Sequence, residues 1–188
     1  MRVRSICPLE RKNQGDTVMT RKTMVYVGCV FMALLLLNVG CQSKVDALQT
    51  APDFSLKDVN GNDITLSQFK GRIVVLDFWA TWCPPCRMSI PELTRLQKEF
   101  RSQGLVVIGV SLDDPVQASN LFLKAFMEKF DMNYKVLRYD MKVMKDYFGA
   151  DNPAIPTMFV IDRDGKIRNK IVGYRHGMLK KSIEALLQ

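Results

Sequence analysis

Histidine and cysteine are scarce in this chain of 188 residues, which contains one histidine, His176, and five cysteines. Zinc sites combine several Cys and His ligands, and no second Cys-x-x-Cys or Cys/His pair accompanies Cys83 and Cys86. Covalent haem attachment requires a histidine directly after the second cysteine, where Arg87 stands instead. These shortages argue against a structural metal site or a haem. We expect no metal and no cofactor, and assign no role to His176.

The sequence also lacks a basic stripe with interleaved aromatic residues. The net charge is +8, but residues 1–40 carry +4 of it, and the remaining +4 belongs to a segment in which both signs are mixed. We therefore expect no nucleic-acid partner. Neither an internal repeat nor a low-complexity segment is present. The length fits one ordinary domain with additional sequence, and a hydrophobic content of 47% is sufficient for a core.

No apolar run reaches the roughly 20 residues that a membrane-spanning helix needs. The longest one, residues 25–39, follows two basic residues and precedes small ones, as in a secretory signal. Residues 1–40 are therefore predicted to be a signal peptide. Because that signal is more typical when translation begins at Met19, we expect residues 1–18 to be a mis-assigned start.

The end of this segment, Asn38-Val39-Gly40-Cys41, resembles a bacterial lipobox, although leucine is usual where Asn38 stands. This similarity predicts cleavage and lipidation at Cys41, with residues 41–50 as a polar tether. Simple cleavage and an uncleaved anchor are the alternatives. The protein would then be a lipoprotein on the extracytoplasmic (periplasmic) side of the cell envelope, and Gln42 favours the outer membrane if the host has two membranes.

Processing of this kind simplifies the cysteine count. Cys7 and Cys29 leave with the signal and Cys41 takes the lipid, so only Cys83 and Cys86 remain. An oxidising compartment makes a disulfide between these two thermodynamically accessible.

The motif Trp82-Cys83-Pro84-Pro85-Cys86 follows a predicted strand and precedes a predicted helix. The unpaired N–H groups and the dipole of a first helical turn favour negative charge, so Cys83 is expected to ionise more readily than a free thiol. Cys86 stands one turn later on the same face, within disulfide reach. This spacing predicts that Cys83 attacks and Cys86 resolves, while Pro84 and Pro85 hold the first turn without needing an N–H.

Hydrophobic periodicity predicts an α/β fold with a mixed sheet, helices on both faces and an N-terminal β-hairpin. The expected strands cover residues 54–56, 64–66, 73–79, 105–112, 134–139, 157–162 and 166–172. The expected helices cover residues 84–103, a segment from Asp113-Asp114-Pro115 to about Phe130, and residues 141–148 and 178–187.

Several segments together resemble the thioredoxin superfamily, and in particular the TlpA/ResA-like membrane-tethered thiol–disulfide oxidoreductases. They are Ala51-Pro52-Asp53-Phe54, the run from Val75 to Arg87, Pro91-Glu92-Leu93, Ile155-Pro156-Thr157 and residues 159–165. The resemblance covers residues 51–188. It implies a thioredoxin-like domain there, redox activity and a cis peptide bond before Pro156.

Asp77 interrupts an apolar strand, where a charge is costly unless it is used. The matching Asp of thioredoxin-like proteins lies buried below the cysteine pair as a proton acceptor, so Asp77 is expected to deprotonate Cys86. The alternative is an edge Asp bonded to backbone. TlpA/ResA-like sequences often have Asn at the position of Asp77 and Glu at the position of Ser89. In this chain the acid is absent from position 89 and stands instead at position 77, where thioredoxin-like proteins have Asp.

Substrate contacts are expected around the cysteines. Pro156 would face the disulfide and expose the backbone of Ile155 to strand-like pairing with a substrate peptide. An ordinary strand-start proline is the alternative. Trp82 is a candidate for substrate contact together with Pro84 and Pro85, whereas Trp79 is predicted to be core.

Pro84 and Pro85 add nothing that stabilises the thiolate beyond the helix terminus, so we expect a reducing pair, in an exported, membrane-tethered protein. A membrane electron donor would supply it, and its targets would be disulfides of exported proteins, as in cytochrome c maturation or metal-chaperone thiols. A thiol peroxidase is a less favoured alternative, because Ala80 stands where peroxiredoxins have threonine three places before the cysteine. A non-catalytic client-binding module or thiol chaperone is the other alternative.

Overall fold

The structure, a computed structural model, describes residues 49–151 and 153–188. The expected signal peptide, Cys41 and most of the tether lie outside this part of the chain. Within it, no helix is both long enough and apolar enough to cross a bilayer.

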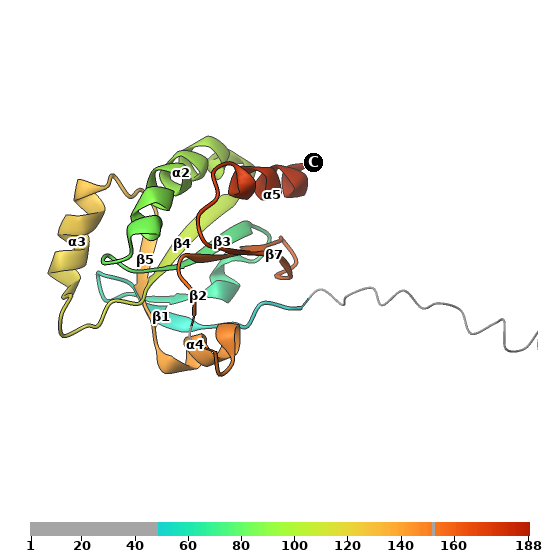
Figure 1. Ribbon diagram of the computed structural model, residues 1–188. Helices are drawn as coiled ribbons and strands as arrows, with labels where there is room; N and C mark the ends of the chain where they lie inside the picture. Colours follow the sequence, from blue (N-terminus) through green and yellow to red (C-terminus); the bar gives the residue numbers. More distant parts are fainter. Residues whose placement is uncertain (1–48, 152) are drawn as a thin grey trace, which may run out of the picture. The chain divides into compact units, whose positions relative to one another are not determined.

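A five-stranded mixed sheet forms the centre of the domain, in the order β5-β4-β3-β6-β7 (Figure 1). β3 (Ile73–Trp79) pairs in parallel with β4 (Leu105–Ser111), and β4 pairs in parallel with β5 (Lys135–Arg138). On its other side β3 pairs antiparallel with β6 (Thr157–Ile161), which pairs antiparallel with β7 (Ile167–Val172). Every residue of β3 is buried, which explains why all of its residues except Asp77 are apolar.

Helices cover both faces of this sheet (Figure 1). One core cluster joins the inner residues of the sheet to α2 (Pro84–Phe100), α3 (Asn120–Lys129) and α5 (Met178–Leu187). A second cluster on the opposite face includes α4 (Met141–Phe148) and the separate hairpin of β1 (Ser55–Lys57) and β2 (Asp63–Thr65). Two short 3₁₀ helices, η1 (Leu66–Phe69) and η2 (Arg101–Gln103), complete the elements.

The alternation of β3 assigns its side chains to these two layers. Val75 and Trp79 belong to the cluster under α2, and Val74, Leu76 and Phe78 belong to the cluster under α4. Because side chains alternate along a strand, Asp77 faces the α2 layer, the one that contains both cysteines.

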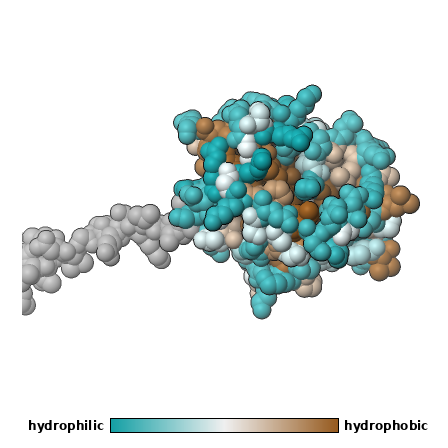
Figure 2. All heavy atoms as spheres, turned by 180° about the vertical axis from the view of Figure 1, so that it is seen from behind, coloured by the Kyte–Doolittle hydropathy of each residue, from teal (hydrophilic) through white to brown (hydrophobic). Residues whose placement is uncertain are grey.

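The face drawn in Figure 2 is mainly polar, with apolar side chains appearing between polar ones. The large apolar side chains that remain exposed include Trp82, Val116 and Met141.

The predicted fold class, the mixed sheet and the hairpin are confirmed, and the bounds of β3, α4 and α5 coincide with the prediction. The expected helix start at Asp113-Asp114-Pro115 is wrong, because α3 begins at Asn120, after Ser119 accepts the Phe122 N–H as its N-cap. The preceding segment forms a turn in which Asp114 accepts the N–H of Val116.

The predicted helix over residues 84–103 is also corrected. α2 ends at Phe100, and its last turn tightens into η2. Gly104 then stops the segment with a φ of 94°, a left-handed conformation that glycine adopts without strain.

Candidate redox site

Cys83 lies at the junction between the connection that follows β3 and the start of α2. It is the N-cap residue of α2, with φ −90° and ψ 107°, and its Sγ accepts the Cys86 N–H at 3.2 Å. Pro84 and Pro85 occupy the first turn, where the absence of their N–H groups leaves no bond unmade. Cys83 and Cys86 form a disulfide across a Cα–Cα distance of 5.2 Å, as the spacing predicted.

The chain segment before β6 lies against this disulfide. The Sγ atom of Cys83 is 3.7 Å from the carbonyl oxygen of Ile155, and the Ile155–Pro156 peptide bond is cis, as the resemblance implied. Cys86 is fully buried, whereas Cys83 keeps 3% of its surface exposed. The structure therefore brings Cys83, Cys86, Ile155 and Pro156 together, with Cys83 as the more accessible sulfur.

A groove of about 990 Å³ adjoins this arrangement and includes Trp82 and Ile155 in its lining. Other apolar side chains of the groove are Leu112, Tyr139, Met141 and Met144. Trp82 is 66% exposed, which leaves its ring available for contact, whereas Trp79 is buried in the core as predicted.

Asp77 lies in the middle of the sheet, with 1% of its surface exposed. It is opposite Gly109 of β4 and Met158 of β6. The alternative of an edge Asp bonded to backbone is therefore wrong. Burial raises the pKa of Asp77 to about 8, so the carboxyl holds a proton at neutral pH in the disulfide form.

A second buried carboxylate supports the segment before Cys83, and sequence reasoning missed it. Asp113 is 2% exposed and accepts the backbone N–H of Thr81 at 3.1 Å and its hydroxyl at 2.6 Å. Ser111, at the end of β4, donates its hydroxyl to the same carboxylate at 2.8 Å. The polar residues that follow β4 in the sequence were the signal that could have indicated this buried carboxylate.

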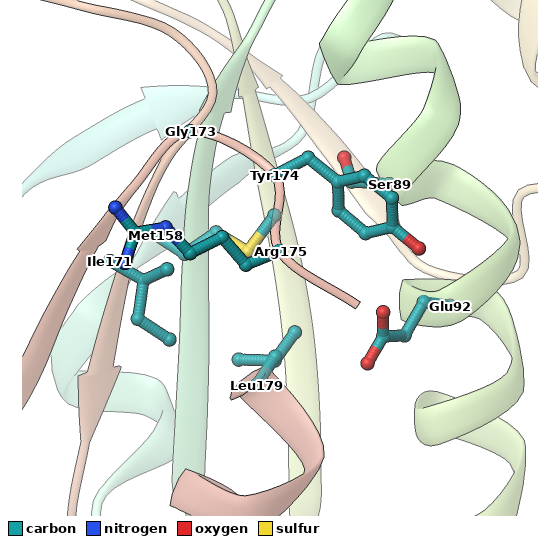
Figure 3. Close-up of a pocket in the computed structure, with 8 residues that line it drawn as sticks. All are labelled: Ser89, Glu92, Met158, Ile171, Gly173, Tyr174, Arg175 and Leu179. Carbon is teal, nitrogen blue, oxygen red and sulfur yellow. The ribbon is translucent and has the colours of Figure 1, made fainter. Parts of the chain in front are cut away.

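Figure 3 shows the surroundings of Ser89, the position where TlpA/ResA-like sequences often have Glu. Ser89 is buried and donates its hydroxyl to the carbonyl oxygen of Cys86 at 2.8 Å. Glu92, one turn further from the cysteines, lines the same pocket as Ser89 and accepts the Gly177 N–H at 3.1 Å. The ring of Tyr174 extends towards both helix positions, and its pKa is raised by burial and by the charge of Glu92. Glu92 thus fixes the chain before α5.

A mixed five-stranded sheet, a Cys-x-x-Cys disulfide at a helix N-terminus and a facing cis-proline together define a thioredoxin-like thiol–disulfide oxidoreductase. Residues 47–170 match the AhpC/TSA family, and the chain belongs to that family.

Individual relatives agree with this class. The chain is 36% identical over 139 residues to the thioredoxin-like protein YneN of Bacillus subtilis (strain 168), covering 74% of this chain and 77% of the relative. It is 33% identical over 141 residues to the thiol-disulfide oxidoreductase ResA of Geobacillus kaustophilus, covering 74% and 75%. A crystal structure of a thiol:disulfide interchange protein of the thioredoxin family from Chlorobium tepidum TLS aligns with a TM-score of 0.66 at 29% identity, covering 74% of this chain and 97% of that chain.

The predicted resemblance and the oxidoreductase activity are thereby confirmed. The individual roles assigned to the site residues stay predictions, namely those of Cys83, Cys86, Asp77, Trp82, Pro84, Pro85, Ile155 and Pro156.

Proposed function

We propose that this protein is an exported, membrane-tethered oxidoreductase that reduces disulfides of other exported proteins. The observation that carries the proposal is the position of the Cys83 sulfur at the N-cap of α2, where the Cys86 N–H points at it. A thiolate there interacts favourably with the helix dipole. Pro84 and Pro85 add no charge beyond that of the helix terminus, which favours a reducing pair over a strong oxidant.

The reaction would proceed in two exchange steps. The Cys83 thiolate attacks one sulfur of the substrate disulfide, a bond forms between Cys83 and the substrate, and the other substrate sulfur leaves as a thiolate. Cys86 then transfers its thiol proton to Asp77, and its sulfur attacks the Cys83 sulfur. The second substrate thiolate leaves, so that the substrate gains two electrons and the enzyme retains the Cys83–Cys86 disulfide.

Asp77 suits the role of proton acceptor in the second step. It is buried in the layer that contains Cys86, and its pKa of about 8 keeps the accepted proton in the disulfide form. The same proton is available for Cys86 when an electron donor reduces the disulfide again.

The substrate would approach over Ile155 and Pro156. The Ile155 carbonyl is close to Cys83, which is consistent with strand-like pairing of an extended substrate backbone next to the reacting sulfur. Trp82, Pro84 and Pro85 would contact the substrate side chains nearest to its disulfide.

The tether and the partners are parts of the same proposal. A lipid on Cys41 would hold the domain at the extracytoplasmic face of a membrane, and a membrane protein would supply the electrons. The targets would be exported proteins such as apocytochrome c or metal chaperones. Mass spectrometry of the N-terminal peptide of the mature protein tests the anchor, and a diacylglycerol-modified Cys41 is the expected result. A mature chain that begins elsewhere would contradict the lipoprotein anchor.

The catalytic part is tested by reduction of insulin disulfides with dithiothreitol as electron source. The wild-type protein is expected to accelerate the reaction, and Cys83→Ser is expected to abolish the acceleration. A wild-type protein that binds insulin without turnover would support the alternative, a non-catalytic client-binding module.

A further inference from the structure

Three buried polar atoms lie without a hydrogen-bond partner in the part of the chain that the structure describes. They are Oδ1 of Asp77, Nε1 of Trp79 and the hydroxyl oxygen of Tyr134. Buried polar groups are normally paired, and each one that is left alone requires an explanation. All three belong to the α2 side of the sheet.

Gly109 is the point around which these side chains gather. It lies directly opposite Asp77 on β4. A Cβ atom at this position would be 2.8 Å from Nε1 of Trp79 and 3.4 Å from Cε2 of Tyr134. The two rings therefore both lie against the glycine. Glycine inside a buried strand marks a close approach of this kind, because a larger residue here would collide with the Trp79 indole.

The groups that surround Asp77 make Tyr134 its natural partner. Gly109 on β4 and Met158 on β6 do not titrate. The titratable side chains of this core are Cys83 and Cys86 from α2 and Tyr134 from the segment before β5. Burial is the single cause of the raised pKa of Asp77, so no charged side chain among the described residues offsets it.

Tyr134 can act only as a neutral donor. Its side chain is buried, and burial, with a further contribution from the charge of Asp77, raises its pKa well above the usual range. The phenol therefore keeps its proton at physiological pH. The ring of Tyr134 also lies against Gly109, the residue opposite Asp77, so the two side chains belong to the same part of the core.

We propose that Tyr134 is a positioning residue for proton transfer, whose hydroxyl donates to the Asp77 carboxylate through one bridging water beside Gly109. The inference rests on the proposed role of Asp77 as proton acceptor. The transferred proton moves from the Cys86 thiol to Asp77, and Tyr134 keeps its own. Without a donor, burial keeps the carboxyl protonated over more of the physiological pH range, so a smaller fraction of the molecules could accept that proton.

The experiment compares Tyr134→Phe with Tyr147→Phe. Tyr147 is the matched control, because it is equally buried but donates its hydroxyl to the Pro52 carbonyl in the core cluster on the other face of the sheet. The ionisation midpoint of the Asp77 carboxyl is measured by NMR titration of the oxidised protein with ¹³C-labelled aspartate. Tyr134→Phe is expected to raise this midpoint by about one pH unit or more, since a donor to the ionised form is lost. Tyr147→Phe is expected to leave it unchanged. A Tyr134→Phe midpoint equal to that of the wild type would overturn the inference.

A kinetic measurement separates this inference from the function on which it rests. The rate at which Cys86 resolves a mixed disulfide on Cys83 is followed against pH in both variants and in Asp77→Asn. If Asp77→Asn keeps the wild-type pH profile, the proton-acceptor role itself fails. If Asp77→Asn loses that profile while Tyr134→Phe retains it, only the role of Tyr134 fails. A Tyr134→Phe profile displaced to higher pH supports the proposal.

Discussion

The carboxylate of Asp113 holds Thr81 from a position 32 residues further along the chain. Both of its oxygens face the Thr81 N–H, at 3.2 and 3.1 Å, and Oδ1 also accepts the Thr81 hydroxyl at 2.6 Å. Thr81 stands two residues before Cys83, between the end of β3 and the first turn of α2. The position of the Cys83 sulfur is therefore fixed by the residues that follow β4 as well as by α2.

Asp113→Ala is expected to loosen this connection. The variant leaves the Thr81 N–H and the hydroxyls of Thr81 and Ser111 without their acceptor, so we expect a loss of about 2–3 kcal/mol in the free energy of unfolding and slower insulin reduction. Urea denaturation and the insulin assay measure the two effects. Asp114→Ala is the control, because this neighbouring carboxylate accepts backbone N–H groups only from the exposed turn. Equal effects of the two substitutions would contradict the role given to Asp113.

Asp77 is expected to make the stability of the oxidised protein depend on pH. Burial raises its pKa from an ordinary value of 3.8 to about 8, so between these values the unfolded chain releases a proton that the folded protein keeps. The contribution of Asp77 to the free energy of unfolding is thus fully present below about pH 4. It is lost as the pH rises towards 8, by on the order of 5 kcal/mol.

Asp77→Asn is expected to remove most of this dependence and to stabilise the oxidised protein at pH 8. Urea denaturation from pH 5 to 9 is the measurement. Asp63→Asn serves as control, because Asp63 forms an exposed ion pair with Lys57. A wild-type protein whose stability is flat across this range would contradict the buried, protonated state of Asp77.

Gly109→Ala is expected to disturb the packing under α2. The added methyl group would lie 2.8 Å from Nε1 of Trp79, which forces the indole to move, and overpacking of this kind costs about 1–3 kcal/mol. Thermal unfolding measures the loss, and the fluorescence of Trp79 in a Trp82→Phe background reports the displacement. An unchanged melting temperature and spectrum would show that the space beside Asp77 is less confined than the geometry indicates.

Trp82→Ala is expected to affect large substrates and spare small ones. The side chain is 66% exposed beside the apolar groove, so its loss leaves the fold intact. We expect KM for a polypeptide disulfide to rise roughly tenfold, or about 1.4 kcal/mol of binding, with the rate on hydroxyethyl disulfide unchanged. Val116→Ser, at a side chain 94% exposed outside the groove, is expected to change neither rate. Parallel losses on both substrates would exclude a binding role for Trp82.

The parts of the fold that were predicted correctly are those whose pattern is local. The continuous apolar run of β3 and the amphipathic period of α5 each reflect burial that repeats along the segment itself. The start of α3 was missed because Pro115 also suits a first helical turn. The contact of Asp113 with Thr81 excludes a helix start at this point. That contact depends on the end of a strand far away in the sequence.

The candidate site likewise contains residues that local sequence patterns predict and residues that they do not. Cys83, Cys86 and Pro156 belong to short motifs whose residues carry their own geometry, and the structure brings them together as expected. Tyr134 and Gly109 were not singled out, because their relation to Asp77 arises only from the register of β3 with β4 and from the approach to β5. Residue types alone do not show which strands become neighbours.

In the proposed reaction Cys83 attacks the substrate disulfide and Cys86 resolves the mixed disulfide. Covalent trapping tests this assignment of the two cysteines. Reduced Cys86→Ser and Cys83→Ser proteins are each mixed with a disulfide-containing peptide, and the adducts are identified by mass spectrometry. We expect a stable mixed disulfide on Cys83 in Cys86→Ser and essentially none on Cys86 in Cys83→Ser, because Cys86 is fully buried. Equal adducts on the two sulfurs, or an adduct on Cys86 alone, would contradict it.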